Sequence, residues 1–151
     1  MKAENNRTRI MVVNGPNLNL LGRREPGIYG NGTMEQCLAA LRVHYPEVDI
    51  DAFQSNIEGE LVTCLQRAAA EGYDGIVLNA AAYTHTSIAL LDAVRAISTP
   101  VVEVHISNVA AREPFRHISL IAPACLGSIS GFGLDSYHLA VEALLARIQT
   151  V

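Results

Sequence analysis

The chain has 151 residues, of which half are hydrophobic and 17% are charged, and its formal net charge is −4. This length and this hydrophobic content predict one folded domain with a single core, and they exclude an intrinsically disordered chain. A net negative charge without a basic block indicates neither a nucleic-acid partner nor an anionic membrane surface. No apolar run reaches the length of a membrane span or resembles a cleavable leader, and residues 1–9 are expected to form a frayed polar tail.

The cysteines and the single lysine indicate the cellular compartment and argue against several types of reaction. Cys37, Cys64 and Cys125 are odd in number and far apart, which predicts free thiols and a cytoplasmic protein. Lys2 is the only lysine, so Schiff-base chemistry, a P-loop lysine and a phosphorelay lysine are not expected. The histidines lack metal-ligand spacing along the chain, so a metal site is not expected.

The start of the chain is a strand followed by a long polar connection. Residues 10–13 (Ile-Met-Val-Val) are apolar and largely β-branched, which predicts a buried strand. Residues 15–32 then carry asparagines, two arginines and a tyrosine between several glycines. A connection of this length inside a compact chain is typically functional. Its composition favours an active-site loop or lid.

Helices and strands alternate after this loop. Thr33 and Gln36 have the spacing of a capping box, so a helix is expected from Thr33 to about His44. Apolar and acidic residues alternate over 48–53, as in a half-exposed edge strand. An apolar stripe at helical spacing predicts the next helix over 61–71.

The second half of the chain repeats the alternation. Residues 75–79 and 101–105 are apolar runs that end in a polar residue, which predicts two more buried strands. A helix over 87–97 separates them, and residues 128–130 and 134–148 are expected to be the last strand and the last helix.

Five strands that alternate with helices predict an α/β fold, in which helices cover both faces of a parallel sheet. At this length the pattern fits the flavodoxin-like, doubly wound five-stranded order 2-1-3-4-5. Strands 1, 3 and 4 are then neighbours, and ligands of such folds bind at the carboxyl ends of the strands. The polar residues at these ends come from three regions: Asn14 with Asn17, Asn79, and His105 with Ser107.

Several familiar sites do not match. Gly127–Gly131 has its serines at the wrong places for a nucleophile elbow. Ser136 replaces the third glycine of a dinucleotide fingerprint that begins at Gly131, so packing is the better interpretation of that motif. Asn14 and Asn79 stand where a phosphorelay receiver needs acidic residues.

Acid and base chemistry by histidine and tyrosine remains. Glu103 and His105 lie two residues apart in one strand and therefore share a face. A carboxylate in an apolar run needs a partner, so this is either a satisfied core pair or a glutamate that orients an acid/base histidine. The neighbouring Ser107, Asn17 and Asn79 favour the second interpretation.

Tyr29 and the arginines also allow two interpretations each. A loop tyrosine usually packs, but a guanidinium such as that of Arg24 on the same loop favours the ionised phenol that a base requires. Residues 108–123 are predicted to be irregular, with one short helical turn that brings Arg112 and Arg116 to one side. These two arginines form either a solvated surface pair or a clamp for a carboxylate.

Five blocks in a defined order carry a family resemblance: NGPNLNLLGRREPGIYG, QSNIEGEL, YTHTSIAL, EVHISNVAAREPFRH and GFGLDSY. Together they resemble the type II 3-dehydroquinate dehydratases over about Ile10 to Ala146. The resemblance implies a flavodoxin-like fold, trimers that assemble to a dodecamer, and no metal or cofactor. It also implies a reversible anti elimination of water from 3-dehydroquinate through an enolate, giving 3-dehydroshikimate, in the shikimate pathway or in quinate catabolism. The single tail lysine agrees, since the unrelated type I enzymes use a Schiff-base lysine.

The resemblance assigns catalytic and binding roles. Tyr29 matches the base that takes the C2 proton, and Arg24 matches the arginine that favours the tyrosinate. Asn17 matches an asparagine that orders a water against the enolate. His105 matches the acid that protonates the departing C1 hydroxyl, and Glu103 positions it. The substrate-binding set implied by the family is Asn79, His85, Ile106, Ser107, Arg112 and Arg116, with Asp92 reaching in from a neighbouring subunit.

Four residues depart from the family pattern: Ile57, Ala110 and Ile118 replace common histidines, and Leu91 replaces a common arginine. None of them falls on a named catalytic position, and Ile118 and Leu91 bear on trimer contacts. Two other functions stay open at this point. One is a non-catalytic flavodoxin-like module that binds a small carboxylate, and the other is a related lyase or isomerase acting on another cyclic hydroxy-ketone.

Overall fold

The computed structural model describes residues 6–149 and contains a five-stranded parallel sheet in the order β2-β1-β3-β4-β5. This order confirms the predicted flavodoxin-like, doubly wound topology. The strands are β1 (Thr8–Asn14), β2 (Val48–Gln54), β3 (Gly75–Asn79), β4 (Val101–His105) and β5 (Gly127–Ser130).

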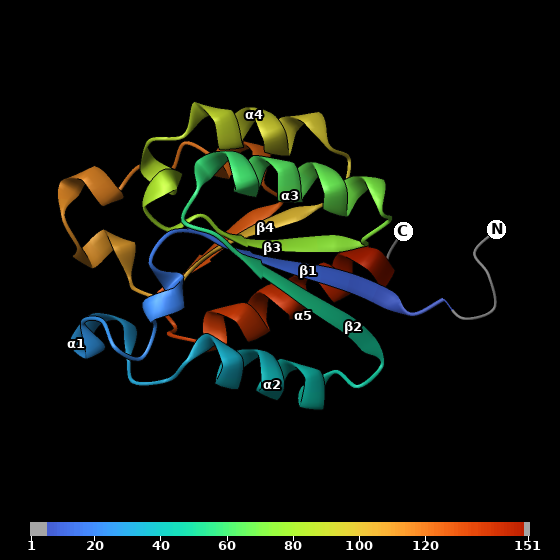
Figure 1. Cartoon of the computed structure of the whole chain (residues 1–151), viewed down its shortest axis with the longest axis horizontal. Coiled ribbons are helices and arrows are strands. Elements are labelled where there is room, and N and C mark those ends of the chain that lie inside the picture. The colour runs from blue at the N-terminus through green and yellow to red at the C-terminus, as the bar shows by residue number, and fades with distance from the viewer. Residues whose placement is uncertain (1–5, 150–151) are drawn as a thin grey trace.

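Four helices cover the sheet, two on each face (Figure 1). One face carries α2 (Met34–His44) and α5 (Asp135–Gln149), and the other carries α3 (Glu58–Ala70) and α4 (Ile88–Ala96). A helical layer forms on each face of the sheet because successive side chains along a strand point to opposite faces.

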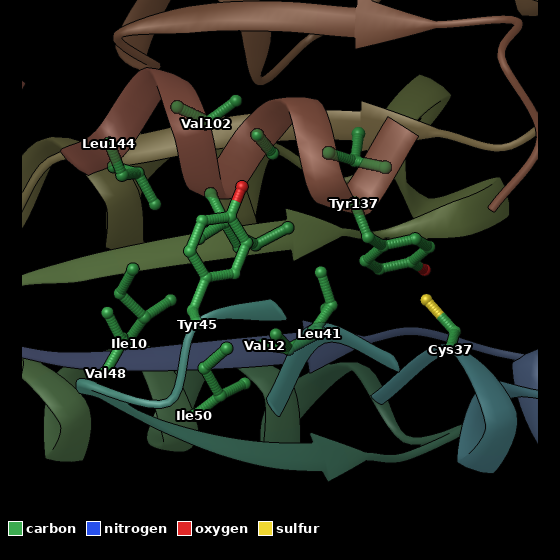
Figure 2. Close-up of a cluster of buried hydrophobic side chains, with 14 of the residues drawn as sticks. Ile10, Val12, Cys37, Leu41, Tyr45, Val48, Ile50, Val102, Tyr137 and Leu144 are labelled. Carbon is green, nitrogen blue, oxygen red and sulfur yellow. The ribbon is translucent and has the colours of Figure 1, made fainter. Parts of the chain in front are cut away.

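Two hydrophobic clusters show this alternation in β1. Ile10 and Val12 pack toward α2 and α5, as Figure 2 shows. Met11 and Val13 pack on the other side, against residues of α3 and α4. The central strands are therefore apolar on both faces, as their continuous apolar sequence predicted.

The predicted start signal of α2 is confirmed. The Thr33 hydroxyl accepts from Gln36 N and the Gln36 side chain accepts from Thr33 N, which completes the capping box of α2. The Ser87 hydroxyl accepts from Leu90 N and caps α4.

Two boundaries differ from the predictions. β1 begins at Thr8, which pairs with Val48, so Thr8 and Arg9 belong to the sheet and not to a frayed tail. Residues 1–5 of that predicted tail lie outside the described residues. α3 begins at Glu58, before the apolar stripe, because acidic residues in a first turn complement the helix dipole.

The loops hold more helical turns than expected. The predicted loop 15–32 contains a 3-10 turn, η1 (Leu18–Leu20), and the short helix α1 (Pro26–Tyr29), and η2 (Ala81–His85) follows β3. The irregular segment after β4 has three 3-10 turns instead of one: η3 (Val109–Ala111), η4 (Pro114–Arg116) and η5 (Ala122–Ala124). Figure 1 shows α1 and the turns after β4 gathered at the end of the sheet where β1 finishes.

Within residues 6–149, no helix combines the length and the apolar character needed to cross a bilayer.

Candidate active site

The site is built on the carboxyl ends of β1, β3 and β4. Asn14 and Asn79 are paired in register as the last residues of their strands, and His105 ends β4. The backbone continues this contact beyond the strands, because Gly15 N donates to Asn79 O at 2.7 Å. Three chain regions that are distant in sequence thus meet at the predicted edge of the sheet.

A buried phenol joins two of these strand ends. The Tyr137 hydroxyl donates to Asn14 Oδ1 at 2.7 Å and accepts from Asn79 Nδ2 at 2.8 Å. Burial raises the pKa of Tyr137, which the hydrogen bond from Asn79 offsets only in part. The phenol therefore stays protonated and acts as a fixed donor to Asn14.

Glu103 lies behind His105 in an unusually polar part of the core. Glu103 Oε2 is 2.9 Å from His105 Nε2, and the hydroxyls of Ser119 and Ser128 each donate to Glu103 at 2.5 Å. Burial alone raises the pKa of this carboxyl, but the hydrogen bonds from His105, Ser119 and Ser128 outweigh it and lower the pKa below its ordinary value. Glu103 is thus an ionised acceptor, so Nε2 of His105 carries a proton toward it.

Tyr29 lies among guanidinium groups. Arg112 Nη1 donates to the Tyr29 hydroxyl at 2.8 Å. The guanidinium carbons of Arg24 and Arg112 lie 5.0 and 5.3 Å from the centre of the Tyr29 ring. The loop 15–32 places a positive charge beside Tyr29 through Arg24, as expected. The direct hydrogen bond to the Tyr29 hydroxyl, however, comes from Arg112 on the segment after β4.

His85 stacks above His105 with ring centres 6.2 Å apart. Its Nδ1 lies 2.8 Å from the carbonyl oxygen of Ile118, and a carbonyl only accepts, so Nδ1 carries the proton. In the neutral ring Nε2 is then an acceptor.

One pocket collects most of the residues singled out from the sequence. The site residues that line it are Asn17, Arg24, Tyr29, Asn79, His85, His105, Ile106, Ser107, Arg112 and Arg116. Arg112 precedes η4 and does not share a helical turn with Arg116, yet both reach the pocket. Glu103 does not line the pocket itself, but it is hydrogen-bonded to His105, which does. Asp92 is exposed on α4 and lies outside the pocket of this single chain.

The pocket is electropositive although the chain is acidic. Three arginines line it. Arg24 has Glu25 at 3.5 Å, and Arg116 is paired with Glu113. Nε of Arg112 is buried and has no hydrogen-bond partner among residues 6–149. Three guanidinium groups around one pocket favour an anionic ligand such as a carboxylate.

Three supporting residues were not singled out as site residues. Tyr137 holds Asn79, and Ser119 and Ser128 hold Glu103. Their signal in the sequence is weak, because a hydroxyl in a helix or loop does not show which strand end it will meet. Only the GFGLDSY block, which ends at Tyr137, marked the region.

The sheet order defines a flavodoxin-like α/β protein, and histidine, tyrosine and arginine side chains line the pocket at the carboxyl ends of its strands. Residues 8–145 match the model of the family described as dehydroquinase class II. The chain belongs to this family, the type II 3-dehydroquinate dehydratases.

Relatives and solved structures agree over nearly the whole chain. The 3-dehydroquinate dehydratase of Exiguobacterium sp. is 57% identical over 91% of this chain and 94% of its own length. That of Rhizobium etli is 59% identical over 89% and 94%. The crystal structure of the type II dehydroquinase from Butyrivibrio crossotus is 44% identical, covers 92% of this chain and 98% of its own, and superposes with a TM-score of 0.89.

Proposed function

We propose that the chain catalyses the reversible anti dehydration of 3-dehydroquinate to 3-dehydroshikimate through an enolate. The observation that carries the proposal is that Tyr29, hydrogen-bonded to a guanidinium, and His105, backed by an ionised Glu103, line the same pocket. A base and an acid on one pocket suit the removal of a proton and a hydroxyl from neighbouring carbons. Family membership supplies the substrate.

Tyr29 acts as the base. Its phenolate takes the proton from C2, and the electrons of that C–H bond move into the neighbouring ketone to give the enolate. The hydrogen bond from Arg112 and the cation of Arg24 both favour the phenolate, because each interacts more strongly with the charged form. The C2 proton is acidic enough for this base only if the enolate is stabilised as it forms.

Asn17 serves that purpose by ordering a water against the enolate oxygen. Its backbone stands in the left-handed region at φ 69°, and its N–H donates to Asn56 Oδ1 at 2.9 Å. These two features fix the backbone of Asn17, which lines the pocket.

His105 acts as the acid. When the enolate collapses, the C1–O bond breaks, and the departing hydroxyl takes a proton from the imidazolium and leaves as water. Glu103 accepts from Nε2, so Nδ1 is the nitrogen that remains for the substrate. The carboxylate also stabilises the imidazolium that must exist before the transfer.

The remaining lining residues hold the substrate. Arg116, with the Ile106 and Ser107 backbone, receives the carboxylate, and the Arg112 guanidinium adds a positive charge to the pocket. Asn79 and His85 hold the ring hydroxyls, and His85 offers Nε2 as an acceptor.

The loop 15–32 acts as a lid over this pocket. α1, which carries Tyr29, has no fully buried residue, and it is held by the half-buried Tyr29 ring, which packs against the core, and by the Tyr29–Arg112 hydrogen bond. A segment with so few buried contacts opens at low free-energy cost.

A second subunit completes the site. Asp92 is exposed on α4, outside the pocket of its own chain. In a trimer it reaches the pocket of a neighbour, and trimers assemble to the dodecamer that the family resemblance implies.

A reducing compartment such as the cytoplasm suits the thiols. All three cysteines are free. Burial raises the pKa of Cys37 to about 11 and that of Cys125 to about 12, so both are protonated and unreactive at neutral pH. The reaction serves aromatic biosynthesis or quinate breakdown, which share this step.

The test is an assay with 3-dehydroquinate that follows the ultraviolet absorbance of the conjugated product, with and without borohydride. We expect turnover that survives borohydride, because no Schiff base forms. Tyr29→Phe removes the base and is expected to abolish turnover while substrate binding, measured by calorimetry, stays near normal. Tyr73→Phe, which removes a phenol far from the pocket, is the matched control.

Each alternative has its own result. Binding without turnover by the folded wild-type chain would indicate the non-catalytic module. Turnover of a different cyclic hydroxy-ketone, but not of 3-dehydroquinate, would indicate the related lyase or isomerase. Near-normal turnover by Tyr29→Phe would remove Tyr29 as the base, and inactivation by borohydride would contradict the enolate route.

A further inference from the structure

A group of potential metal ligands lies between α2 and α5, away from the pocket. Within residues 6–149, His44, His138 and Glu142 form the one group of three or more histidine, cysteine or acidic side chains whose ligand atoms all lie within 4.8 Å of one another. His44 ends α2, and His138 and Glu142 stand one turn apart on α5. Their separation in the sequence hides this arrangement, which is why spacing along the chain predicted no metal site.

The geometry is close to that of a bound ion. Zn²⁺ binds imidazole nitrogen and carboxylate oxygen at about 2.0–2.2 Å, so two ligands of one ion lie at most about 4 Å apart. The 4.8 Å limit observed here exceeds that value by less than 1 Å, which side-chain rotation can close. His44 and Glu142 are exposed and His138 is half-buried, so an ion reaches the group from solvent.

A buried phenol holds two of the three ligands. The Tyr45 hydroxyl donates to Glu142 Oε1 at 2.6 Å, and its oxygen lies 3.4 Å from His138 Nδ1. Because the Tyr45 proton goes to Glu142, the Tyr45 oxygen can accept from Nδ1–H, which leaves Nε2 of His138 with a free lone pair. Figure 2 shows the Tyr45 hydroxyl directed at α5 from across the core. Outer hydrogen bonds of this kind orient the ligands of metal sites.

The rings and the surface around the group leave room for an ion. The His44 and His138 rings meet edge to face with centres 4.6 Å apart, and their ligand nitrogens lie within 4.8 Å of each other. Both histidines border a groove of about 310 Å³ between α2 and α5. This space can hold the water that fills the open coordination position of a three-ligand site.

We propose that His44, His138 and Glu142 bind one divalent transition-metal ion of the Zn²⁺ type. The ion joins the last turn of α2 to α5 and stabilises the packing of these helices. α2 ends shortly before β2 begins, at the amino ends of the strands, and the pocket lies at their carboxyl ends. The site therefore takes no part in the dehydration.

The test uses the full chain without an affinity tag, stripped of metal by a chelator. Calorimetry with Zn²⁺ is expected to show one ion per chain, and Co²⁺ is expected to give the visible absorption bands of a tetrahedral nitrogen and oxygen site. Zn²⁺ is also expected to raise the Tm, because an ion that binds only the folded state stabilises it. Turnover of 3-dehydroquinate is expected to be the same with and without the ion.

Four variants separate a built site from loose surface binding. His44→Ala and Glu142→Gln are expected to abolish the stoichiometric binding and the Zn²⁺ shift in Tm. Tyr45→Phe keeps the three ligands and is expected to weaken binding about 10-fold or more. Glu35→Gln, an exposed acid in the first turn of α2, is the matched control and is expected to bind as the wild type does. Absence of stoichiometric binding in the wild type, or equal binding by wild type and His44→Ala, would overturn the proposal and leave the group as aromatic packing.

Discussion

Tyr137 shows how one buried side chain can set the orientation of a binding group. The Asn79 amide is fixed at both ends, because Nδ2 donates to the Tyr137 oxygen and Oδ1 accepts from Ala81 N at 3.1 Å. Swapping the oxygen and nitrogen of this amide would break both bonds. Asn79 also lines the pocket, so the phenol and the Ala81 N–H together set which of its atoms the substrate meets.

Tyr137→Phe tests this positioning role. The substitution leaves Asn14 Oδ1 and Asn79 Nδ2 without their buried partner, and an unsatisfied buried polar group costs about 1–3 kcal/mol. We therefore expect a lower free energy of unfolding in urea, and a KM that rises more than kcat falls. Tyr73→Phe is the control, since its hydroxyl bonds to the exposed Asp51. An unchanged KM in a destabilised Tyr137→Phe would mean that Asn79 is oriented without the phenol.

At the scale of elements, the junction of β1 and β3 fixes the base of the site. A Cβ on Gly15 would lie 2.6 Å from the carbonyl oxygen of Ala80, which is backbone and cannot move aside like a flexible side chain. Both connections that start here, toward Asn17 and toward His85, carry residues of the pocket. The close approach of the two backbones therefore explains why residue 15 is a glycine although its φ is not positive.

Gly15→Ala and Gly59→Ala are expected to change stability in opposite directions. Gly15→Ala forces the strand ends apart, and overpacking of this kind costs about 1–3 kcal/mol. It should also lower kcat/KM, because Asn17 moves with the loop. Gly59 lies in α3 with open space around its Cβ position, so alanine there should stabilise by about 0.5–1 kcal/mol through helix propensity. Thermal and urea unfolding of both variants measure this, and equal stability of the two would refute the role given to Gly15.

Local signals explain which elements were predictable. The capping box of α2 and the apolar runs of β3 and β4 are each encoded by neighbouring residues, and all three appear where expected. Only one of the three 3-10 turns after β4 was predicted, because each turn satisfies only a few backbone bonds and has little apolar periodicity. Arg112 therefore reaches Tyr29 from an extended residue and not from a helical turn.

At the scale of the whole molecule, α4 carries an apolar surface beside a proposed site residue. Ile88 is 65% exposed and stands one turn before Asp92 on the same face of the helix. If Asp92 completes a neighbour's pocket, Ile88 must lie in the same contact between subunits.

Ile88→Glu is therefore expected to break the trimer. A charge buried in a subunit contact without a partner is strongly unfavourable. Light scattering after gel filtration should give the mass of a smaller species, and KM should rise because Asp92 is lost from the neighbouring pocket. Val43→Glu, at a position 81% exposed on α2, should leave both unchanged. Normal assembly of Ile88→Glu would place the subunit contact elsewhere, and full activity of a monomer would show that the site is complete in one chain.

The sequence pattern by itself determined the fold class, the strand order and the residues of the pocket that lie at the strand ends, and the family resemblance supplied the other pocket residues. This was possible because strand periodicity and helix signals are local, and because parallel strands bring their carboxyl ends to one edge. The tertiary structure alone decided the partners of these residues: Arg112 on Tyr29, two serines on Glu103, and Tyr137 between Asn14 and Asn79. It likewise brought His44 to His138 from opposite ends of the chain. Such pairs are set by how helices pack on the sheet and by the paths of loops, and no local pattern encodes those distances.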